Sequence, residues 1–187
     1  MYPVFVSDGI VLGKRIAGEE NTLVAILTRE HGLIRASARA ARRENSKLRY
    51  GVETLSQANF SFIRGKYEWK LTGALKISHA LIPSQASGRQ AAGRISRLIL
   101  RLIHGEEKNA ALYTTVHEGF AALARDVDVE AVLVLRVLSH LGYLPDTPEL
   151  KPFIEQDFFS LELTNRVNAS RSLLIKVINE SLGATGL

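Results

Sequence analysis

The sequence predicts an α+β chain of two domains, a small five-stranded β-domain followed by an all-α domain. Before about residue 82, short β-rich runs alternate with turns that contain glycine. After Pro83, apolar residues recur at spacings of three and four, which is typical of amphipathic helices. We therefore expect a β-domain over residues 1–80 and a helical domain over residues 81–187.

Five runs in the first part have the composition of strands. The first begins at residues 10–12, and the others cover residues 22–28, 33–38, 54–63 and 67–77. Turns are expected at residues 30–32 and 64–66, where glycine follows or separates polar residues. Five short strands joined by short turns predict a small barrel or a sandwich.

Four helices are expected in the second part. The first carries its apolar residues between Ile95 and Ile103, and the second covers residues 110–123. A third, strongly apolar helix is expected between an N-cap at Asp128 and a C-terminal glycine at Gly142. A fourth is expected from Asn168 to Gly183.

The positive charge of the chain is concentrated in its first part. The net charge is +5, but residues 1–80 hold 13 lysines and arginines against 7 acidic residues, a net of +6. Residues 81–187 hold 11 against 12, a net of −1. Such an asymmetry is typical of a chain that binds a polyanion, either nucleic acid or an anionic membrane.

Residues 35–49 form the most basic segment, with six positive charges and one negative in fifteen residues. They follow the third predicted strand and can neutralise phosphates without reading sequence. The alternative is a solvated loop without a partner. Further lysines and arginines lie on the first predicted strand and in the predicted turn at residues 64–66. The predicted DNA-contacting residues are Lys14, Arg15, Arg35, Arg39, Arg42, Arg43, Lys47, Arg49, Arg64 and Lys66.

Two further features each have two interpretations. Tyr67 and Trp69 alternate on the fifth predicted strand and so share one sheet face; they either stack on bases or belong to the barrel core. The third helix is typical of a central core helix. The alternative is that it lines an apolar groove for a partner peptide, formed by Arg125, Leu133, Arg136 and Val137.

No pattern typical of catalysis occurs. The chain has no cysteine, its five histidines are scattered, and no serine lies in a Gly-x-Ser-x-Gly turn. We therefore expect no catalytic residue, no metal and no cofactor. No stretch reaches the roughly 20 apolar residues of a membrane span, and the first residues lack the features of a signal peptide. A cytoplasmic, non-enzymatic protein without membrane contact is expected.

Several segments of the first part form a recognisable set: residues 9–15, Gly18-Glu19, the run Leu27-Thr-Arg-Glu-His-Gly-Leu-Ile34, Ala40-Ala-Arg-Arg43 and Ser46. Together they resemble the RecO family of bacterial recombination mediators. A later segment, residues 135–145, is similar to the helical domain of that family. The family's four zinc-binding cysteines follow this later segment. Here Asp146-Thr-Pro stands in their place, so no zinc site is expected.

The resemblance implies an OB-fold barrel followed by a helical domain. It implies binding of single- and double-stranded DNA, annealing of complementary strands, and help in loading recombinase onto DNA coated with single-strand-binding protein. Implied partners are RecR and the acidic, apolar C-terminal tail of the single-strand-binding protein, and the implied location is the bacterial nucleoid. An alternative from the charge pattern is an adaptor whose basic face binds an acidic protein.

Overall fold

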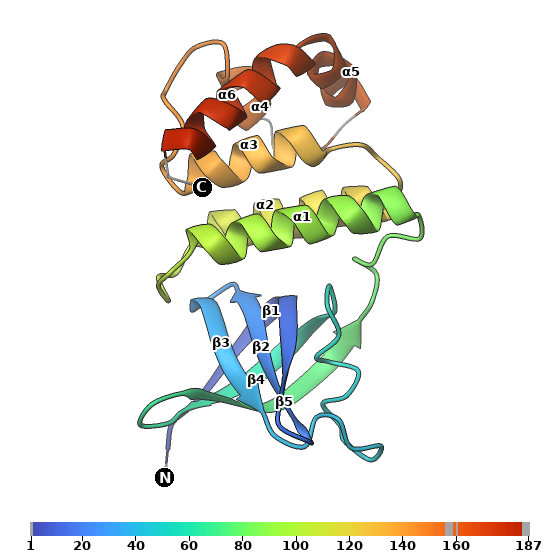
Figure 1. Ribbon diagram of the computed structural model, residues 1–187, viewed down its shortest axis with the longest axis vertical. Coiled ribbons are helices and arrows are strands. Elements are labelled where there is room, and N and C mark those ends of the chain that lie inside the picture. The colour runs from blue at the N-terminus through green and yellow to red at the C-terminus, as the bar shows by residue number, and fades with distance from the viewer. Residues whose placement is uncertain (1, 156–158, 160, 185–187) are drawn as a thin grey trace. The chain divides into compact units, whose positions relative to one another are not determined.

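The computed structural model describes residues 2–155, 159 and 161–184. They form two compact units (Figure 1). The barrel unit consists of residues up to Ile82 together with Ser96–Tyr113, and the helical unit consists of Pro83–Ile95 and the residues from Thr114 onward. Two helices therefore contribute residues to both units. The division into domains at residue 80 stays a proposal.

The barrel is closed by five strands, as expected for an OB-fold. These are β1 (Val4–Ala17), β2 (Asn21–Thr28), β3 (Gly32–Ala38), β4 (Gln57–Arg64) and β5 (Trp69–Ser78). Their order is β1-β2-β3-β5-β4, and β1 closes the barrel by pairing with both β2 and β4. The β3–β5 pair is parallel and the others are antiparallel. The predicted barrel and its five strands are confirmed.

The strand boundaries differ from the predicted ones in three places. The first strand begins six residues earlier than Ile10, at Val4. The fourth begins at Gln57, because Leu55 has a positive φ of 67° and interrupts an extended conformation. The fifth begins at Trp69, so Tyr67 lies in the preceding turn and the predicted pairing of Tyr67 with Trp69 on one strand face is wrong.

The barrel core follows from the alternation of apolar residues. Phe60 and Phe62 are both fully buried, whereas the residues on either side of each point away from the core. Ile26 of β2 and Ile34 of β3 face the same core and are also fully buried. In β1 a bulge lies between Val11 and Gly13, which lets the long strand bend and pair with two neighbours.

The turn between β2 and β3 is fixed by the hydroxyl of Thr28. This hydroxyl donates to the carbonyl of Gly32 at 2.7 Å and accepts a hydrogen bond from the backbone N–H of His31 at 3.0 Å. Thr28 is fully buried, so the bonds are shielded from water. Gly32 has a φ of 64°, which glycine adopts without strain. The Thr-Arg-Glu-His-Gly run is therefore a structural turn.

Among the residues that the structure describes, six helices follow the barrel, and the later ones differ from the prediction. They are α1 (Ala86–Leu102), α2 (Ala110–Ala124), α3 (Glu130–His140), α4 (Lys151–Ile154), α5 (Leu161–Ala169) and α6 (Arg171–Ala184). The single helix expected from Asn168 is two helices that meet at Ser170, and Asn168 lies inside α5. No helix among the described residues is long and apolar enough to cross a membrane.

The ends of α3 were predicted with unequal success. Its N-cap is Val129, without a side-chain hydrogen bond, so the prediction of Asp128 as N-cap is wrong; Asp128 instead lies 3.5 Å from the Arg171 guanidinium. Gly142 has a φ of 76°. The Gly142 N–H donates to the carbonyl of Ser139, and the Tyr143 N–H donates to the carbonyl of Leu138. These two hydrogen bonds form a Schellman motif. The predicted C-terminal glycine is confirmed.

We expect the stability of the helical unit to depend on pH through His140, which lies half-buried on α3. Burial, and secondly the charge of Arg136, lower the pKa of His140 below 6.5, and its Nε2 lies 2.8 Å from the hydroxyl of Thr115. The unfolded chain takes up this proton first, so stability is lost as the pH falls through the ordinary histidine range. In H140Q, we expect the free energy of unfolding to fall less between neutral pH and about pH 5 than in the unaltered chain. Equal pH profiles from denaturant titrations would refute this role.

Candidate nucleic-acid interface

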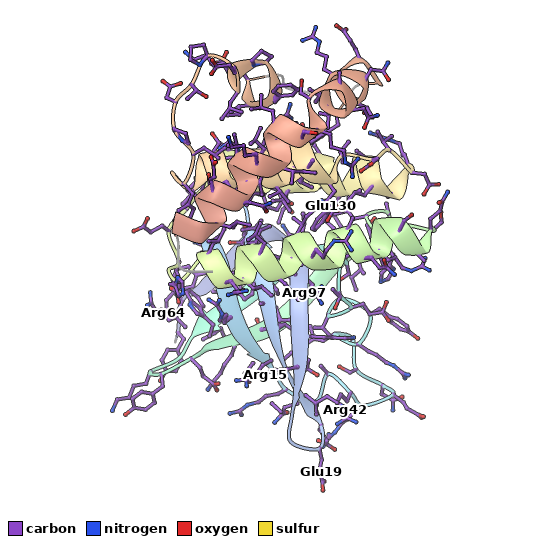
Figure 2. The ribbon with its side chains drawn as sticks, turned by 45° about the horizontal axis from the view of Figure 1, so that its top comes forward. Arg15, Glu19, Arg42, Arg64, Arg97 and Glu130 are labelled. Carbon is purple, nitrogen blue, oxygen red and sulfur yellow. The ribbon has the colours of Figure 1, made fainter. Side chains whose placement is uncertain are left out.

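The basic segment after β3 lies against the turn between β1 and β2. The Ala40 N–H donates to the Asn21 side chain at 3.1 Å, and the Arg42 N–H donates to the Glu20 carbonyl at 3.2 Å. The Arg42 guanidinium also donates to the carbonyl of Glu19 at 2.7 Å. Figure 2 shows Arg15, Glu19 and Arg42 at this end of the barrel. The fold thus brings the start of the basic segment to the turn that Lys14 and Arg15 precede.

The positively charged Arg43 forms an ion pair with a carboxylate of the barrel unit. Its guanidinium lies 2.6 Å from the Glu20 carboxylate, and the hydrogen bond from Arg43 lowers the pKa of Glu20. The same pair raises the pKa of Arg43. Because its charge already has a partner, Arg43 offers less to a phosphate than its neighbours do.

The remaining cations of this region are exposed. In the part of the chain that the structure describes, no ion pair joins any of them to a carboxylate within 4.0 Å. The Arg42 guanidinium donates to the backbone carbonyls of Gly18 and Glu19, which carry no charge to offset its own. We call these residues the turn-side cations: Lys14 and Arg15 on β1, and Arg39, Arg42, Lys47 and Arg49 on the β3–β4 connection.

Arg35 has a structural role that the sequence did not indicate. It lies on the outer face of β3, and its guanidinium donates to the carbonyls of Leu100 and Ile103 at 3.1 and 3.3 Å. These carbonyls lie at the C-terminal end of α1, where such groups lack partners within the helix. The cation also suits the negative end of the helix dipole. Arg35 thereby ties the end of α1 to β3 within the barrel unit.

Arg64 is the last residue of β4, and Lys66 lies on the turn between β4 and β5. In Figure 2, Arg64 appears well apart from Arg42. Its guanidinium is 3.6 Å from the Glu106 carboxylate and stacks over the Trp69 ring, 5.3 Å from the centroid. Lys66 lies 5.1 Å from the Tyr67 ring centroid. These two cations form a second, partly compensated group.

The two aromatic residues of this region have different environments. Trp69 is 7% exposed, contacts Phe5 and Phe62 edge to face, and donates its ring N–H to Glu106 at 2.8 Å. The interpretation of Trp69 as a base-stacking residue is therefore wrong, and it belongs to the core. Tyr67 is 86% exposed, so stacking by Tyr67 stays a prediction.

The predicted partner-peptide groove on α3 is not formed. Leu133 and Val137 are fully buried, and Arg136 is 3% exposed. The Arg136 Nε donates to the Phe153 carbonyl at 2.8 Å, and its guanidinium lies 4.6 Å from the Phe159 ring. Arg125 alone of the four is exposed. The interpretation of these residues as a groove is wrong, because the apolar residues of α3 are turned inward in the helical unit.

A hollow on the outer face of β1, β2 and β3 was missed by sequence reasoning. Its volume is about 320 Å³, and all its lining residues belong to the barrel unit. Lys14, Arg15 and Arg35 supply its cations, and Leu23, Ala25 and Leu100 supply most of its apolar lining. We call it the strand-face hollow. No short sequence pattern predicts the strand-face hollow, because Leu100 is 75 residues from Ala25 in the sequence.

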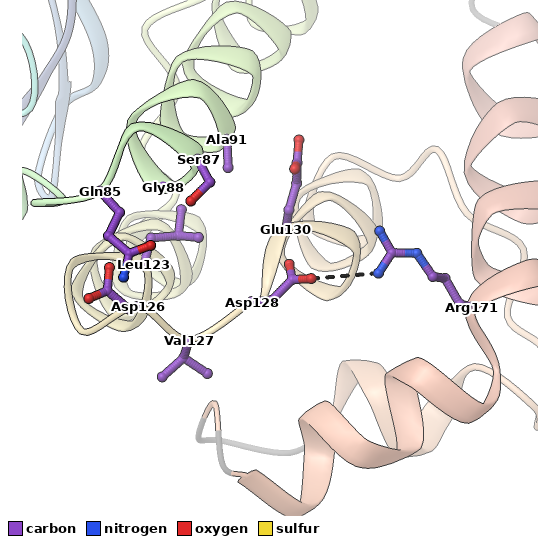
Figure 3. Close-up of a pocket in the computed structure, with 10 residues that line it drawn as sticks. All are labelled: Gln85, Ser87, Gly88, Ala91, Leu123, Asp126, Val127, Asp128, Glu130 and Arg171. Carbon is purple, nitrogen blue, oxygen red and sulfur yellow. Dashed lines mark ion pairs between the residues drawn. The ribbon is translucent and has the colours of Figure 1, made fainter.

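The helical unit has a pocket of about 270 Å³ (Figure 3). Its lining includes Asp126, Asp128, Glu130 and Arg171. Two of the three acids are paired, Asp128 with Arg171 and Glu130 with Arg94. Among the residues that the structure describes, no group of three or more His, Asp or Glu side chains could hold a metal ion.

The comparisons with known proteins agree with the barrel. A family model described as Recombination protein O N terminal matches residues 1–73. A DNA repair protein RecO from Caldanaerobacter subterraneus is 27% identical over 148 residues, which cover 74% of this chain and 58% of that protein. A DNA repair protein RecO from Heliobacterium modesticaldum is 29% identical over 144 residues, which cover 75% of this chain and 52% of that protein.

A third relative, DNA repair protein RecO of Streptomyces griseus, is 42% identical over 59 residues, 32% of this chain and 24% of that protein. The chain spans only a little over half the length of the first two relatives. The family match coincides with the closed OB-type barrel, which it covers as far as β5. Residues 1–73 therefore match the N-terminal domain of RecO proteins, and about three quarters of the chain is similar to curated DNA repair proteins RecO.

Proposed function

We propose that this chain binds DNA through the turn-side cations and acts in recombinational repair. The observation that carries the proposal is that these residues are exposed and without carboxylate partners in the described chain. Cations of this kind bind phosphates by releasing counterions, which makes binding independent of sequence and sensitive to salt. The names of the relatives, which are DNA repair proteins, support the same proposal.

We further propose that both single- and double-stranded DNA bind and that complementary strands are annealed. Two strands repel each other through their phosphates, and cations placed between them lower this repulsion. The role is electrostatic, and no catalytic step is proposed. Loading of recombinase onto DNA coated with single-strand-binding protein, with RecR and the acidic tail of that protein as partners, belongs to the same proposal through the family resemblance.

A strand-annealing assay with complementary oligonucleotides tests this function. We expect the chain to accelerate annealing, both on bare strands and on strands coated with single-strand-binding protein. The acceleration should fall in the variant R39Q/K47Q/R49Q, which removes three turn-side cations. A control of equal charge change, R125Q/R166Q/K176Q, alters exposed residues of the helical unit, of which Arg166 and Lys176 are paired with Glu162 and Glu180. Equal loss in both variants, or no acceleration by the unaltered chain, would refute the proposal.

A further inference from the structure

We infer that two copies of this chain associate through the outer surface of β1, β4 and β5. We call this surface the β1–β4–β5 face. It consists of the outward-pointing side chains of residues 4–8, 59–63 and 70–75, all of which belong to the barrel unit. It contains none of the turn-side cations and none of the residues that line the strand-face hollow.

Strand alternation decides which residues form this face. On β4, Phe60 and Phe62 are fully buried in the barrel core, so the residues next to them point outward. The pairing of β1 with β4 and of β4 with β5 extends the same alternation across the three strands. The outward side chains of neighbouring strands therefore line up in three rows, each running from β1 to β5.

The uncharged part of the face carries exposed apolar side chains. Val4 and Val6 of β1 are 58% and 50% exposed, and Leu75 of β5 is 66% exposed. Ile63 of β4 pairs with Val4 and is partly buried. Neighbouring exposed apolar side chains gain free energy when a second surface removes them from water, and contiguous patches of this kind mark interaction sites.

Two residues of opposite charge lie at diagonally opposite corners of the face. Asp8 lies on β1 in the row that ends at Leu75, and Lys70 lies on β5 in the row that begins at Val4. Asp8 accepts a hydrogen bond from the Asn59 amide at 2.9 Å. In the part of the chain that the structure describes, neither Asp8 nor Lys70 forms an ion pair within 4.0 Å. The face is therefore complementary in charge to a second copy of itself.

A twofold axis brings the two charged corners of facing copies together. The axis lies between the copies and runs along the diagonal that joins the two uncharged corners. Asp8 of each copy then meets Lys70 of the other, and Val6 of each copy lies over Ile63 of the other. Both copies make the same contacts, as a twofold interface requires. The strands of the two copies cross at a large angle, which is the geometry of orthogonally packed sheets.

The size of the face sets the expected strength of the association. Strands lie about 4.8 Å apart and outward residues about 6.8 Å apart along a strand, so three strands and three rows cover roughly 300 Å². A stable complex buries about 800 Å² on each partner. We therefore expect a reversible dimer with a dissociation constant on the order of 100 µM.

The dimer has a consequence for annealing. None of the turn-side cations belongs to the face, so both copies keep theirs available. If each copy holds one strand, as the proposed function requires, the dimer raises the local concentration of one strand near the other. This step rests on the proposed function, whereas the association of two copies does not.

Sedimentation velocity of the full chain without DNA tests the association. We expect the sedimentation coefficient to rise over about 10–500 µM, as a dissociation constant of that order predicts. In D8K and in K70E, the dissociation constant should rise roughly tenfold, because each substitution turns two attractive pairs of the dimer into repulsive pairs. The double variant D8K/K70E exchanges the two charges and should restore the association.

Two further variants complete the test. V6K places a charge in the apolar part of the face and should abolish the association. E44K is the control for D8K, since it makes the same change of charge at an exposed residue of the β3–β4 connection, outside the face. It should associate as the unaltered chain does. Circular dichroism and thermal unfolding of each variant show that a lost association does not come from a lost fold.

Three results would each overturn the inference: a chain that stays monomeric over this range, a D8K/K70E variant that associates no better than D8K and K70E, or an E44K variant as weak as D8K. The annealing assay tests the consequence separately. D8K and K70E should both slow annealing, and D8K/K70E should restore its rate. Unchanged annealing in both single variants would contradict the use of the dimer, and absence of DNA binding would contradict the proposed function alone.

Discussion

Replacing Arg39, Lys47 and Arg49 with glutamine will weaken binding to DNA of any sequence and make that binding less sensitive to salt. Each of these residues is exposed, and in the described chain none forms an ion pair with a carboxylate. Each phosphate contact contributes about 0.7 to 0.9 to the slope of log affinity against log salt concentration, so the slope should fall by roughly 2 to 3. Fluorescence anisotropy with labelled oligonucleotides over a series of salt concentrations measures this slope.

The same experiment on R43Q gives an internal comparison. Because Arg43 is paired with Glu20 at 2.6 Å, its removal leaves a carboxylate without its partner and adds a negative charge to the region. The double variant E20Q/R43Q removes both charges and should bind nearly as the unaltered chain does. A loss in E20Q/R43Q as large as in the triple variant would mean that Arg43 contacts phosphate despite its partner.

The second large effect is expected at Gly32, where alanine should lower the free energy of unfolding by roughly 2–4 kcal/mol. The φ of 64° is strained for alanine. In addition, a Cβ atom at this position would collide with the backbone carbonyl of Glu107, which belongs to the same unit. Backbone cannot move aside as a side chain can, so the segment after α1 would be displaced from the barrel.

Gly18 offers the matched control for this variant. It also has a positive φ, 73°, but a Cβ atom there would meet nothing within 4 Å. G18A should therefore cost only the backbone strain, about 1 kcal/mol. Urea denaturation of both variants measures the difference. Equal losses in G18A and G32A would show that the close approach of Glu107 contributes nothing.

The residue pattern alone was sufficient to predict five strands but left a barrel and a sandwich open, and the choice of a barrel came from the resemblance to the RecO family. Alternation in residues such as Phe60 and Phe62 marks a strand locally, because it depends only on neighbours. Closure of the barrel depends on β1 pairing with two strands through the bulge near Gly13, and no local pattern specifies that. Gly142 was predictable because a C-terminal glycine acts within one turn of its own helix.

The positively charged residues of the candidate site could be predicted from the sequence. The groups that these residues contact in the fold could not. The basic segment can be read directly from residues 35–49. The carboxylate beside Arg43 and the helix end beside Arg35 lie far away in the sequence, and only the fold brings them close. Trp69 was ambiguous for the same reason, since its burial depends on Phe5, Phe62 and Glu106 from separate segments. The strand-face hollow depends on Leu100 and could not be inferred locally.

The most direct test of the central claim is the salt dependence of DNA affinity for the unaltered chain, measured on two oligonucleotides of unrelated sequence. If exposed cations on the barrel bind backbone phosphates, log affinity will fall linearly and steeply with log salt, with the same slope for both sequences. An affinity that does not change with salt, or a slope that differs between the two sequences, would contradict the account.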